Sequence, residues 1–487
     1  MNQSFLSKVN SKEKWLGFLI LPILLFALNF TIKFVHLDTV QVGMDEPFTL
    51  FHAQMPPSTL LKTLSNYNNP PLMELVLHGW TTVFGTSVKA VRMPSLLFSC
   101  LTAVFLFWLG RRVYDWKAGL LASLAFTFTT WNIYFAHEAR VYALFSLLTI
   151  VSLYGLLLLR EKSDSWLRFS LLLFVNILLV YSHYFGFIVI AWECLWVLLV
   201  KHPNRKQMLI RFGIAIVVLV LAYLPQFSIF FQRFGDASGT HWVAKSSFPE
   251  IFNTASKFMN QPVTAVVCLG LMFAAGIKWL VLWAKGKELL KPDVFLLFGL
   301  FPGGYLLLWA VGWKIPVFLD RYTVFAMVGL YLVLGISIVY LLKHKWVQLS
   351  LGIIVLALFA ATTQLAYDPG SEWKEVATKI QTVKGPADAV LLSPWWNHLA
   401  FIYHFDQDIF QDHAHLHARM ESANIWGFMA ETPLSKLKLR DAPAIWVASV
   451  GEAPFHSSLD SLIKTDYIPA APIEGNYGIS IQGFRKK

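Results

Sequence analysis

Long apolar runs separated by short polar segments occupy most of residues 15 to 367. A bilayer core about 30 Å thick requires about 20 apolar residues per helix. By that measure the pattern predicts eleven membrane-spanning helices, at 15–32, 94–110, 118–136, 141–159, 167–182, 185–200, 212–230, 262–284, 294–312, 323–342 and 347–366. Because this number is odd, the two chain ends are expected on opposite sides of the membrane.

Lysine and arginine are distributed unevenly between the connections, and short cation-rich connections face the cytoplasm. Every second connection is rich in cations, which predicts a cytoplasmic N-terminus and an extracytoplasmic segment after residue 367. The cation-rich set holds Lys8, Lys12, Lys14, Arg111, Arg112, Lys117, Arg160, Lys162, Arg168, Lys201, Arg205, Lys206, Arg211, Lys285, Lys287, Lys291, Lys343 and Lys345. The regular alternation also supports the number of helices.

The first outer connection, residues 33–93, is long and has patterned apolar positions. The stretches PSTLLKTLSNY and LMELVLHGWTTVF carry apolar residues near helical spacing, with NNPP between them. Such amphipathic segments are typical of helices that lie along the membrane surface. We therefore expect two surface helices in this loop, interrupted at residues 68–71.

The C-terminal 120 residues, 368–487, have a different pattern. EWKEVATKIQTV and FHSSLDSLIKT favour helices, DAVLLSP and AIWVASV favour buried strands, and YGISIQGF alternates like a strand. The sequence thus predicts two domains. Residues 1–367 form a mainly α, polytopic transmembrane bundle, and residues 368–487 form a small extracytoplasmic α/β domain.

Composition agrees with a membrane location. The chain is 56% hydrophobic and 14% charged, too little polar surface for a soluble protein of 487 residues. Its net charge of +11 lies largely between apolar runs and is not interleaved with aromatics on a soluble segment. This favours anionic membrane lipids as partners and argues against nucleic acid.

Ionisable residues gather at the predicted outer ends of the helices, where they are costly and usually functional. Carboxylates there could accept a proton, and guanidinium groups suit phosphate oxygens. The set favours a reaction between a membrane-soluble phosphorylated donor and an acceptor outside the cytoplasm. It comprises Asp45, Glu46, Arg92, His137, Glu138, Arg140, His183, Lys314, Asp320 and Arg321.

Each of these residues also has a structural interpretation. Lysines at helix ends, such as Lys33 and Lys314, commonly extend to lipid phosphate. Asp45 and Glu46 alone could favour the positive end of a helix dipole. The spacing HAHLH in the tail is a weak signal for zinc, because no carboxylate partner is in view; its histidines are His413, His415 and His417.

The order of five motifs resembles a known family, the bacterial membrane glycosyltransferases related to protein O-mannosyltransferases and to the lipid A aminoarabinose transferase. The motifs are MDEPFTLFHA, NNPPLMELVLHGWTTVFGTSVKAVRMPSLL, FAHEARVYALFSLL, YSHYFGF and LDRYTVFAM. This resemblance, to family 39 of the glycosyltransferase C superfamily, covers the membrane body. It implies an enzyme of the bacterial inner membrane that uses a polyprenyl-phosphate sugar and inverts the anomeric carbon.

The resemblance also assigns roles to residues. Asp45 would be the general base that takes the proton of the acceptor hydroxyl, and Glu46 would shape the site. Arg140, two residues before Tyr142, and Arg321, next to Tyr322, match the family's arginine positions and would bind the lipid phosphate. Four further residues are expected in or near the donor pocket: Arg92, His137, Glu138 and His183.

Some relatives in the wider superfamily bind a divalent metal beside the acidic motif. Asp45, Glu46 and Glu138 are candidate ligands here, but no spacing requires a metal, and no other cofactor is expected. The sequence does not distinguish between protein, lipid A and glycan as the acceptor.

Other functions fit parts of the pattern. A glycolipid transporter or flippase would need ionisable groups near the bilayer midplane and access from both sides. A non-catalytic scaffold would leave the outer charges as solvated loop residues. A sugar polymerase or ligase would share the architecture.

Overall fold

The structure is a computed structural model that describes residues 19–43, 45–65, 70–202, 204–237, 243–287, 291–368, 373–427, 439, 442–450, 457–470 and 479–487. Its contacts divide the chain into two compact units. The first comprises Met1–Thr39 and Leu61–Tyr367, and the second comprises Val40–Leu60 and Asp368–Lys487. Residues 40–60 of the first outer loop thus pack with the C-terminal residues, although the sequence pattern predicted that they belong to the membrane body.

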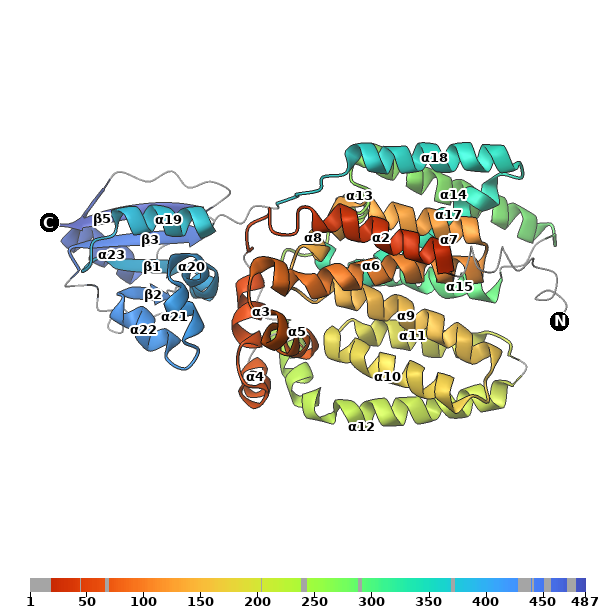
Figure 1. Ribbon diagram of the computed structural model, residues 1–487, viewed down its shortest axis with the longest axis horizontal. Coiled ribbons are helices and arrows are strands. Elements are labelled where there is room, and N and C mark those ends of the chain that lie inside the picture. The colour runs from red at the N-terminus through yellow and green to blue at the C-terminus, as the bar shows by residue number, and fades with distance from the viewer. Residues whose placement is uncertain are drawn as a thin grey trace. The chain divides into compact units, whose positions relative to one another are not determined.

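The first unit is a bundle of helices (Figure 1). It contains α2 (Leu21–Phe34), α5 (Leu72–Phe84), α6 (Val88–Val113), α7 (Trp116–Thr127), α8 (Thr130–Ala136), α9 (Tyr142–Glu161), α10 (Trp166–Ser182), α11 (Gly186–Leu199), α12 (Arg205–Ala237), α13 (Phe248–Lys257), α14 (Pro262–Ala284), α15 (Pro292–Phe298), η2 (Gly299–Gly304), α16 (Tyr305–Val311), η3 (Asp320–Tyr322), α17 (Val324–Leu341) and α18 (Lys345–Thr362). Helix α4 (Pro57–Leu64) spans the boundary between the units. The predicted surface helices correspond to α4 and α5. Residues 66–67, at the end of the first predicted surface helix, and residues 68–69 of the predicted break lie outside the described residues.

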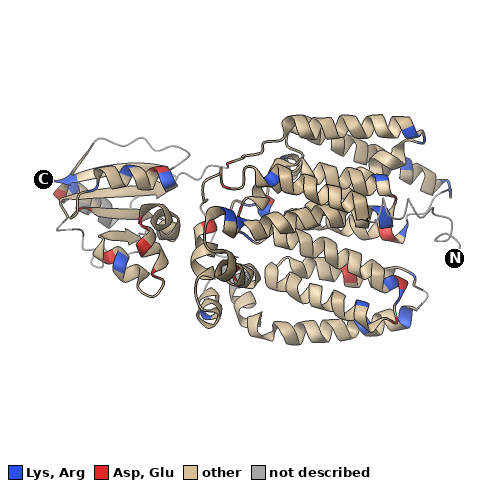
Figure 2. Ribbon diagram, in the orientation of Figure 1, with Lys and Arg blue, Asp and Glu red and all other residues tan. Residues whose placement is uncertain are grey.

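Seven helical segments of the described chain are long and apolar enough to cross a membrane. Three more apolar helices, α2, α10 and α11, are shorter, and residues 15–18 of the first predicted span lie outside the described residues. Charged residues are sparse along the middles of these helices and concentrate near their ends (Figure 2). The prediction of a mainly helical, multi-pass bundle is confirmed.

The predicted span 118–136 is not one helix, because the chain breaks between α7 and α8. Asn260, whose φ is +66°, donates from Nδ2 to the carbonyl of Phe128 at 2.8 Å and accepts the Thr130 N–H at 2.8 Å. The Thr363 hydroxyl donates to the same Phe128 carbonyl at 2.6 Å. A break at membrane depth requires such partners for the freed backbone groups, which an apolar pattern does not reveal.

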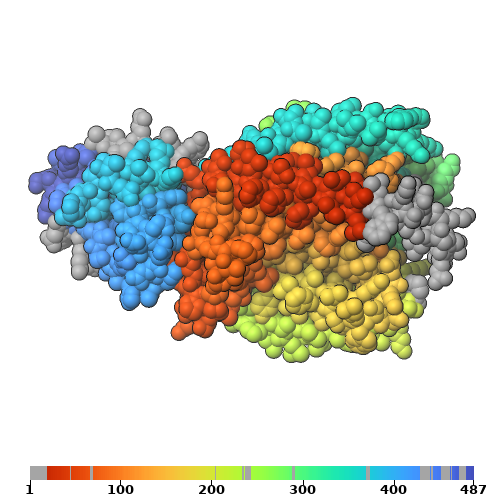
Figure 3. All heavy atoms as spheres, viewed as in Figure 1, coloured from red at the N-terminus to blue at the C-terminus, as the bar shows by residue number. Residues whose placement is uncertain are grey.

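Helix α17 forms the centre of the bundle. Buried residues make up 83% of its most apolar window, against 11% for α12. An apolar helix of uniform composition is expected in such a position, since no face prefers water. The side chains of α10 and α12, which contact each other, form the lower surface of the bundle in Figure 3.

The second unit holds a five-stranded mixed sheet in the order β2-β1-β3-β5-β4. Strand β1 pairs in parallel with β2 and β3, and β5 pairs antiparallel with β3 and β4. The strands are β1 (Ala389–Ser393), β2 (Ile425–Gly427), β3 (Ala444–Val450), β4 (Tyr467–Pro469) and β5 (Ile479–Lys486). The helices are α3 (Glu46–Ala53), α19 (Trp373–Val383), α20 (His398–Phe405), α21 (Gln407–Gln411), α22 (Leu416–Ser422) and α23 (Ser457–Asp466), with the short turn η4 (Trp395–Asn397).

The sheet is buried along its central strands. Ile463 of α23 lies in one apolar cluster with Tyr467 and with Val447 of β3. The same cluster holds Ala389 and Leu391, which alternate along β1. Because side chains alternate across a strand, these residues line one face of the sheet. The predicted α/β form of the tail is confirmed, including the strands at 389–393 and 444–450.

The close packing of α17 against α7 requires a glycine at position 335, and a substitution there tests this requirement. A Cβ at Gly335 would come closer than 3.0 Å to the backbone of Ala118 on α7, whereas one at Gly213 of α12 would meet nothing within 4 Å. We expect Gly335→Ala to destabilise the protein by about 1–3 kcal/mol through overpacking. Thermal melting of the purified protein in detergent checks this, with Gly213→Ala as the matched control; equal melting temperatures would contradict it.

Candidate active site

The turn between α8 and α9 carries three of the predicted site residues. His137 Nε2 donates to the carbonyl oxygen of Lys33 at 2.6 Å, and the Arg140 N–H donates to the Glu138 carbonyl at 2.7 Å. The Ser95 hydroxyl donates to the Arg140 carbonyl at 3.4 Å. The turn is therefore tied to both α2 and α6.

His137 and Arg92 make similar contacts. Arg92 donates from Nη1 to the carbonyl of Leu37 at 2.9 Å, and both side chains are buried. Burial lowers the pKa of His137 to about 4, and the positive charge of Arg92 contributes to the shift. Both residues anchor the chain at and beyond the end of α2, so a role in donor binding stays a prediction.

Two predicted phosphate-binding arginines converge on one histidine. Burial lowers the pKa of His183 to about 3, and the nearby charges of Arg140 and Arg321 lower it further. These arginines come from the turns before α9 and α17, while His183 follows α10. Arg140 and Arg321 are 181 positions apart in the sequence (321 − 140). The structure thus brings together three residues that are distant from one another in the sequence.

Aromatic rings surround this cluster. The His183 ring stacks on Phe145 at 4.7 Å between centroids and meets the edge of Tyr322 at 5.5 Å. The Phe185 N–H donates to His183 Nδ1 at 3.2 Å. The guanidinium of Arg321 lies 5.8 Å from the centroid of its neighbour Tyr322. The cluster therefore offers cationic groups on an apolar, aromatic wall.

The Arg140 side chain is held in the same way. Its guanidinium carbon lies 6.0 Å from the centroid of the Tyr142 ring, and its side chain is buried. Glu138, two residues earlier, is buried as well. Guanidinium groups that are oriented in advance bind phosphate oxygens at a low entropic cost.

The acidic pair lies in the second unit. Asp45 is half-buried at the N-cap of α3 but makes no capping hydrogen bond with its side chain. Glu46 is fully buried, and its Oε2 accepts from the Gly43 N–H at 3.4 Å. Helix capping is therefore not what Asp45 does, although proximity to the helix dipole remains.

Helix α3 packs on helices of the C-terminal residues. His404 Nε2 donates to the Val42 carbonyl at 3.1 Å. The Phe51 ring lies 5.6 Å from that of Phe410 and 4.8 Å from that of His413. The position of the acidic pair is thus set partly by the tail, a link that no pattern in the sequence indicated.

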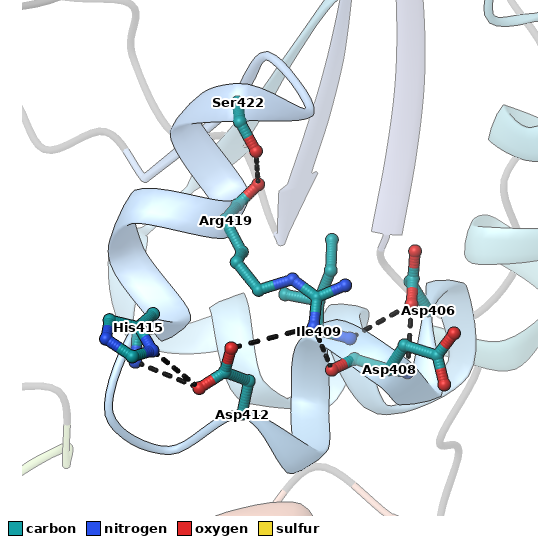
Figure 4. Close-up of polar contacts among 7 residues, drawn as sticks. All are labelled: Asp406, Asp408, Ile409, Asp412, His415, Arg419 and Ser422. Atoms are coloured by element: carbon teal, nitrogen blue, oxygen red, sulfur yellow. Dashed lines mark hydrogen bonds and ion pairs between the residues drawn. The ribbon is translucent and has the colours of Figure 1, made fainter.

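Among the tail histidines, His415 has a hydrogen-bond partner close by in the sequence. His415 Nδ1 donates to Asp412 Oδ1 at 3.1 Å, and Arg419 donates to the carbonyl of Asp408 at 2.9 Å (Figure 4). No group of three or more His, Cys, Asp or Glu that could hold a metal occurs among the described residues.

Lys33 does not extend toward the surface as would be expected of a lysine that contacts lipid phosphate. It is fully buried, its Nζ donates to Ser99 Oγ at 2.7 Å, and it lies 4.7 Å from the centroid of Phe126. An ion pair that the sequence pattern did not predict joins Lys257 and Asp320 at 2.7 Å. The only signal for either was an ionisable residue next to an apolar run.

Comparisons with known proteins agree with this architecture. Residues 68–229 match the family model described as dolichyl-phosphate-mannose-protein mannosyltransferase. No curated protein matches the chain in sequence.

Solved structures match over nearly the whole chain. ArnT from Cupriavidus metallidurans in the apo state aligns with a TM-score of 0.59 and 11% identity, over 97% of this chain and 98% of that one. The same protein bound to undecaprenyl phosphate aligns with a TM-score of 0.58 and 13% identity, over 95% and 97%. The Archaeoglobus fulgidus oligosaccharyltransferase in the apo form aligns with a TM-score of 0.55 and 11% identity, over 90% and 70%.

These findings define the class of protein. The chain is a multi-pass membrane protein with the fold of the C-superfamily glycosyltransferases. The resemblance of its motifs to that superfamily is confirmed at the level of the fold.

The buried His398 of the second unit should make the stability of the fold depend on pH. Burial lowers the pKa of His398 from 6.5 to about 4. Between these values the unfolded chain binds more protons than the folded one. The contribution of His398 to the free energy of unfolding is therefore fully present above pH 6.5. Below that pH the free energy of unfolding falls by at most about 1.4 kcal/mol per pH unit.

Hydrogen-exchange protection of β1 and β3 in the full-length protein, corrected for the intrinsic rate at each pH, measures this loss. The variant His398→Gln should show a smaller decrease in protection between pH 6.5 and 5 than the unmodified protein. Parallel decreases in the two proteins would contradict the assignment.

Proposed function

We propose that the protein is a glycosyltransferase that moves a sugar from a polyprenyl-phosphate donor to an acceptor on the extracytoplasmic side. The observation that carries the proposal is the convergence of Arg140 and Arg321 on buried His183, in a chain with this fold. The structure of ArnT bound to undecaprenyl phosphate supports the class of donor. The family model matched by residues 68–229 supports a lipid-phosphate-linked sugar.

In this mechanism the acceptor oxygen attacks the anomeric carbon while the bond from that carbon to the phosphate oxygen breaks. Asp45 takes the acceptor proton as general base, and the configuration at the anomeric carbon inverts. Negative charge grows on the leaving lipid phosphate, and Arg140 and Arg321 stabilise it electrostatically. Glu46, buried at the start of α3, would orient Asp45.

The neighbouring residues have supporting roles in the proposal. A neutral His183 donates or accepts a hydrogen bond without adding a charge, and Tyr142 and Tyr322 pack against the guanidinium groups. Glu138 would contact the sugar or a divalent metal, as the resemblance implies. The cation-rich connections predict a cytoplasmic N-terminus, so this site would face the opposite side.

Replacing Asp45 tests the general base. Asp45→Asn keeps the shape of the side chain but removes its basicity, so we expect transfer to fall by about 10²–10⁴-fold. Mass spectrometry of envelope glycans in cells that carry only the variant measures transfer. Asp38→Asn, a half-exposed aspartate paired with Lys89, is the matched control. Normal glycans in the Asp45→Asn cells would remove Asp45 from the mechanism.

Replacing the arginines tests the phosphate site. A hydrogen bond to a charged group contributes about 1.5–3 kcal/mol, so Arg140→Ala or Arg321→Ala should each weaken binding of undecaprenyl phosphate about 10- to 100-fold. Titration of the purified variants in detergent measures this, with exposed Arg205→Ala as the control. Unchanged affinity in both site variants would favour a scaffold over a transferase.

A further inference from the structure

A groove in the first unit shares no lining residue with the cluster around His183. It is formed by α14, α15 and α17 together with the end of α6, and its volume is about 120 Å³. Its lining is largely apolar and includes Met272, Phe298, Val333 and Ile336. A groove with such a lining on a membrane bundle is suited to a hydrocarbon chain.

The polar residues of the groove are concentrated at one end. Tyr114 caps the end of α6, Lys291 precedes α15, and Tyr340 lies in the last turn of α17. The Lys291 ammonium is 5.1 Å from the centroid of the Tyr114 ring. These helix ends adjoin the connections whose cations predict the cytoplasmic side.

A second lysine stabilises the same end. Lys278 Nζ donates to the carbonyls of Tyr340 and Leu341 at 2.6 and 3.0 Å. Lys278 thus serves the C-terminus of α17, whereas Lys291 lines the groove and is exposed. The mouth of the groove therefore carries positive charge.

The apolar part runs inward from this mouth. Val333 and Tyr340 are seven residues apart on α17 (340 − 333). This spacing corresponds to about 10 Å along the helix axis. The neighbouring side chain of Phe273 on α14 is 71% exposed, as expected of a surface that faces lipid. The groove thus has a cationic mouth at the helix ends and an apolar floor toward the helix middles.

We propose that this groove is a binding site for an anionic glycerophospholipid of the leaflet on the cation-rich side. One acyl chain lies along α14 and α17, and the headgroup phosphate accepts hydrogen bonds from the Lys291 ammonium and the Tyr114 hydroxyl. Basic pockets between transmembrane helices on that side bind anionic headgroups by the same chemistry. The site is independent of the proposed transferase reaction, and neither proposal fails with the other.

Glycines of α14 provide a sharp test. A Cβ at Gly276, which lines the groove, meets no atom within 4 Å, and the same is true of Gly270, which is not part of the lining. Gly276→Leu should therefore fill the groove without disturbing the helix, and Gly270→Leu is its matched control. Lys291→Ala removes the charge at the mouth, with exposed Lys287→Ala as the control.

The measurement is native mass spectrometry of the full-length protein in neutral detergent, titrated with dioleoylphosphatidylglycerol or dioleoylphosphatidylcholine. We expect a retained phosphatidylglycerol adduct that weakens at least tenfold in Gly276→Leu and in Lys291→Ala, and that persists in both controls. Equal retention of phosphatidylcholine, or equal binding by Gly276→Leu and Gly270→Leu, would overturn the proposal.

A third titration separates this lipid from the sugar donor's carrier. Undecaprenyl phosphate should bind Gly276→Leu as tightly as it binds the unmodified protein, since the donor site is elsewhere. If Gly276→Leu instead abolishes binding of undecaprenyl phosphate, the groove belongs to the donor's tail and the proposal is wrong.

Discussion

The packing of α9 against α17 is the contact on which the candidate active site depends. Phe145 of α9 and Phe325 of α17 are fully buried, and their ring centroids are 5.8 Å apart. Arg140 and Arg321 lie just before the first turns of these two helices. Apolar packing inside the bundle therefore determines where two positive charges emerge, and Phe145 also supports the ring of His183.

In this arrangement the helices provide stability, and the turns at their ends carry the residues proposed for the chemistry. The helices satisfy their own backbone hydrogen bonds, as hydrocarbon demands. Where the chain departs from a helix, as between α7 and α8, side chains such as Asn260 replace the missing partners. The freed turns at the helix ends are then available to carry ionisable residues without exposing backbone groups to lipid.

The second unit gives the C-terminal residues a direct connection to the acidic motif. Its sheet has its own apolar core, and α3 packs on helices of the same unit through Phe51 and the segment around Val42. A domain at the far end of the chain thus helps to hold Asp45 and Glu46. Histidines buried among these helices make the arrangement sensitive to protonation, because burial disfavours their charged form.

The sequence by itself determined the membrane class, most of the spans, the surface helices of the first loop and the α/β form of the tail. Each of these follows from apolar periodicity, which burial imposes locally along the chain. It also singled out Arg140, Arg321 and His183, since ionisable residues at helix ends stand out against an apolar background.

Only the tertiary structure decided which of these residues meet. It placed Arg140 and Arg321 at His183, assigned Arg92 and His137 to backbone carbonyls near α2, and buried Lys33 against Ser99. It also broke the span at 118–136 and joined α3 to the C-terminal residues. The physical reason is that such pairings depend on contacts between residues far apart in the chain, and a local pattern carries no record of the partner.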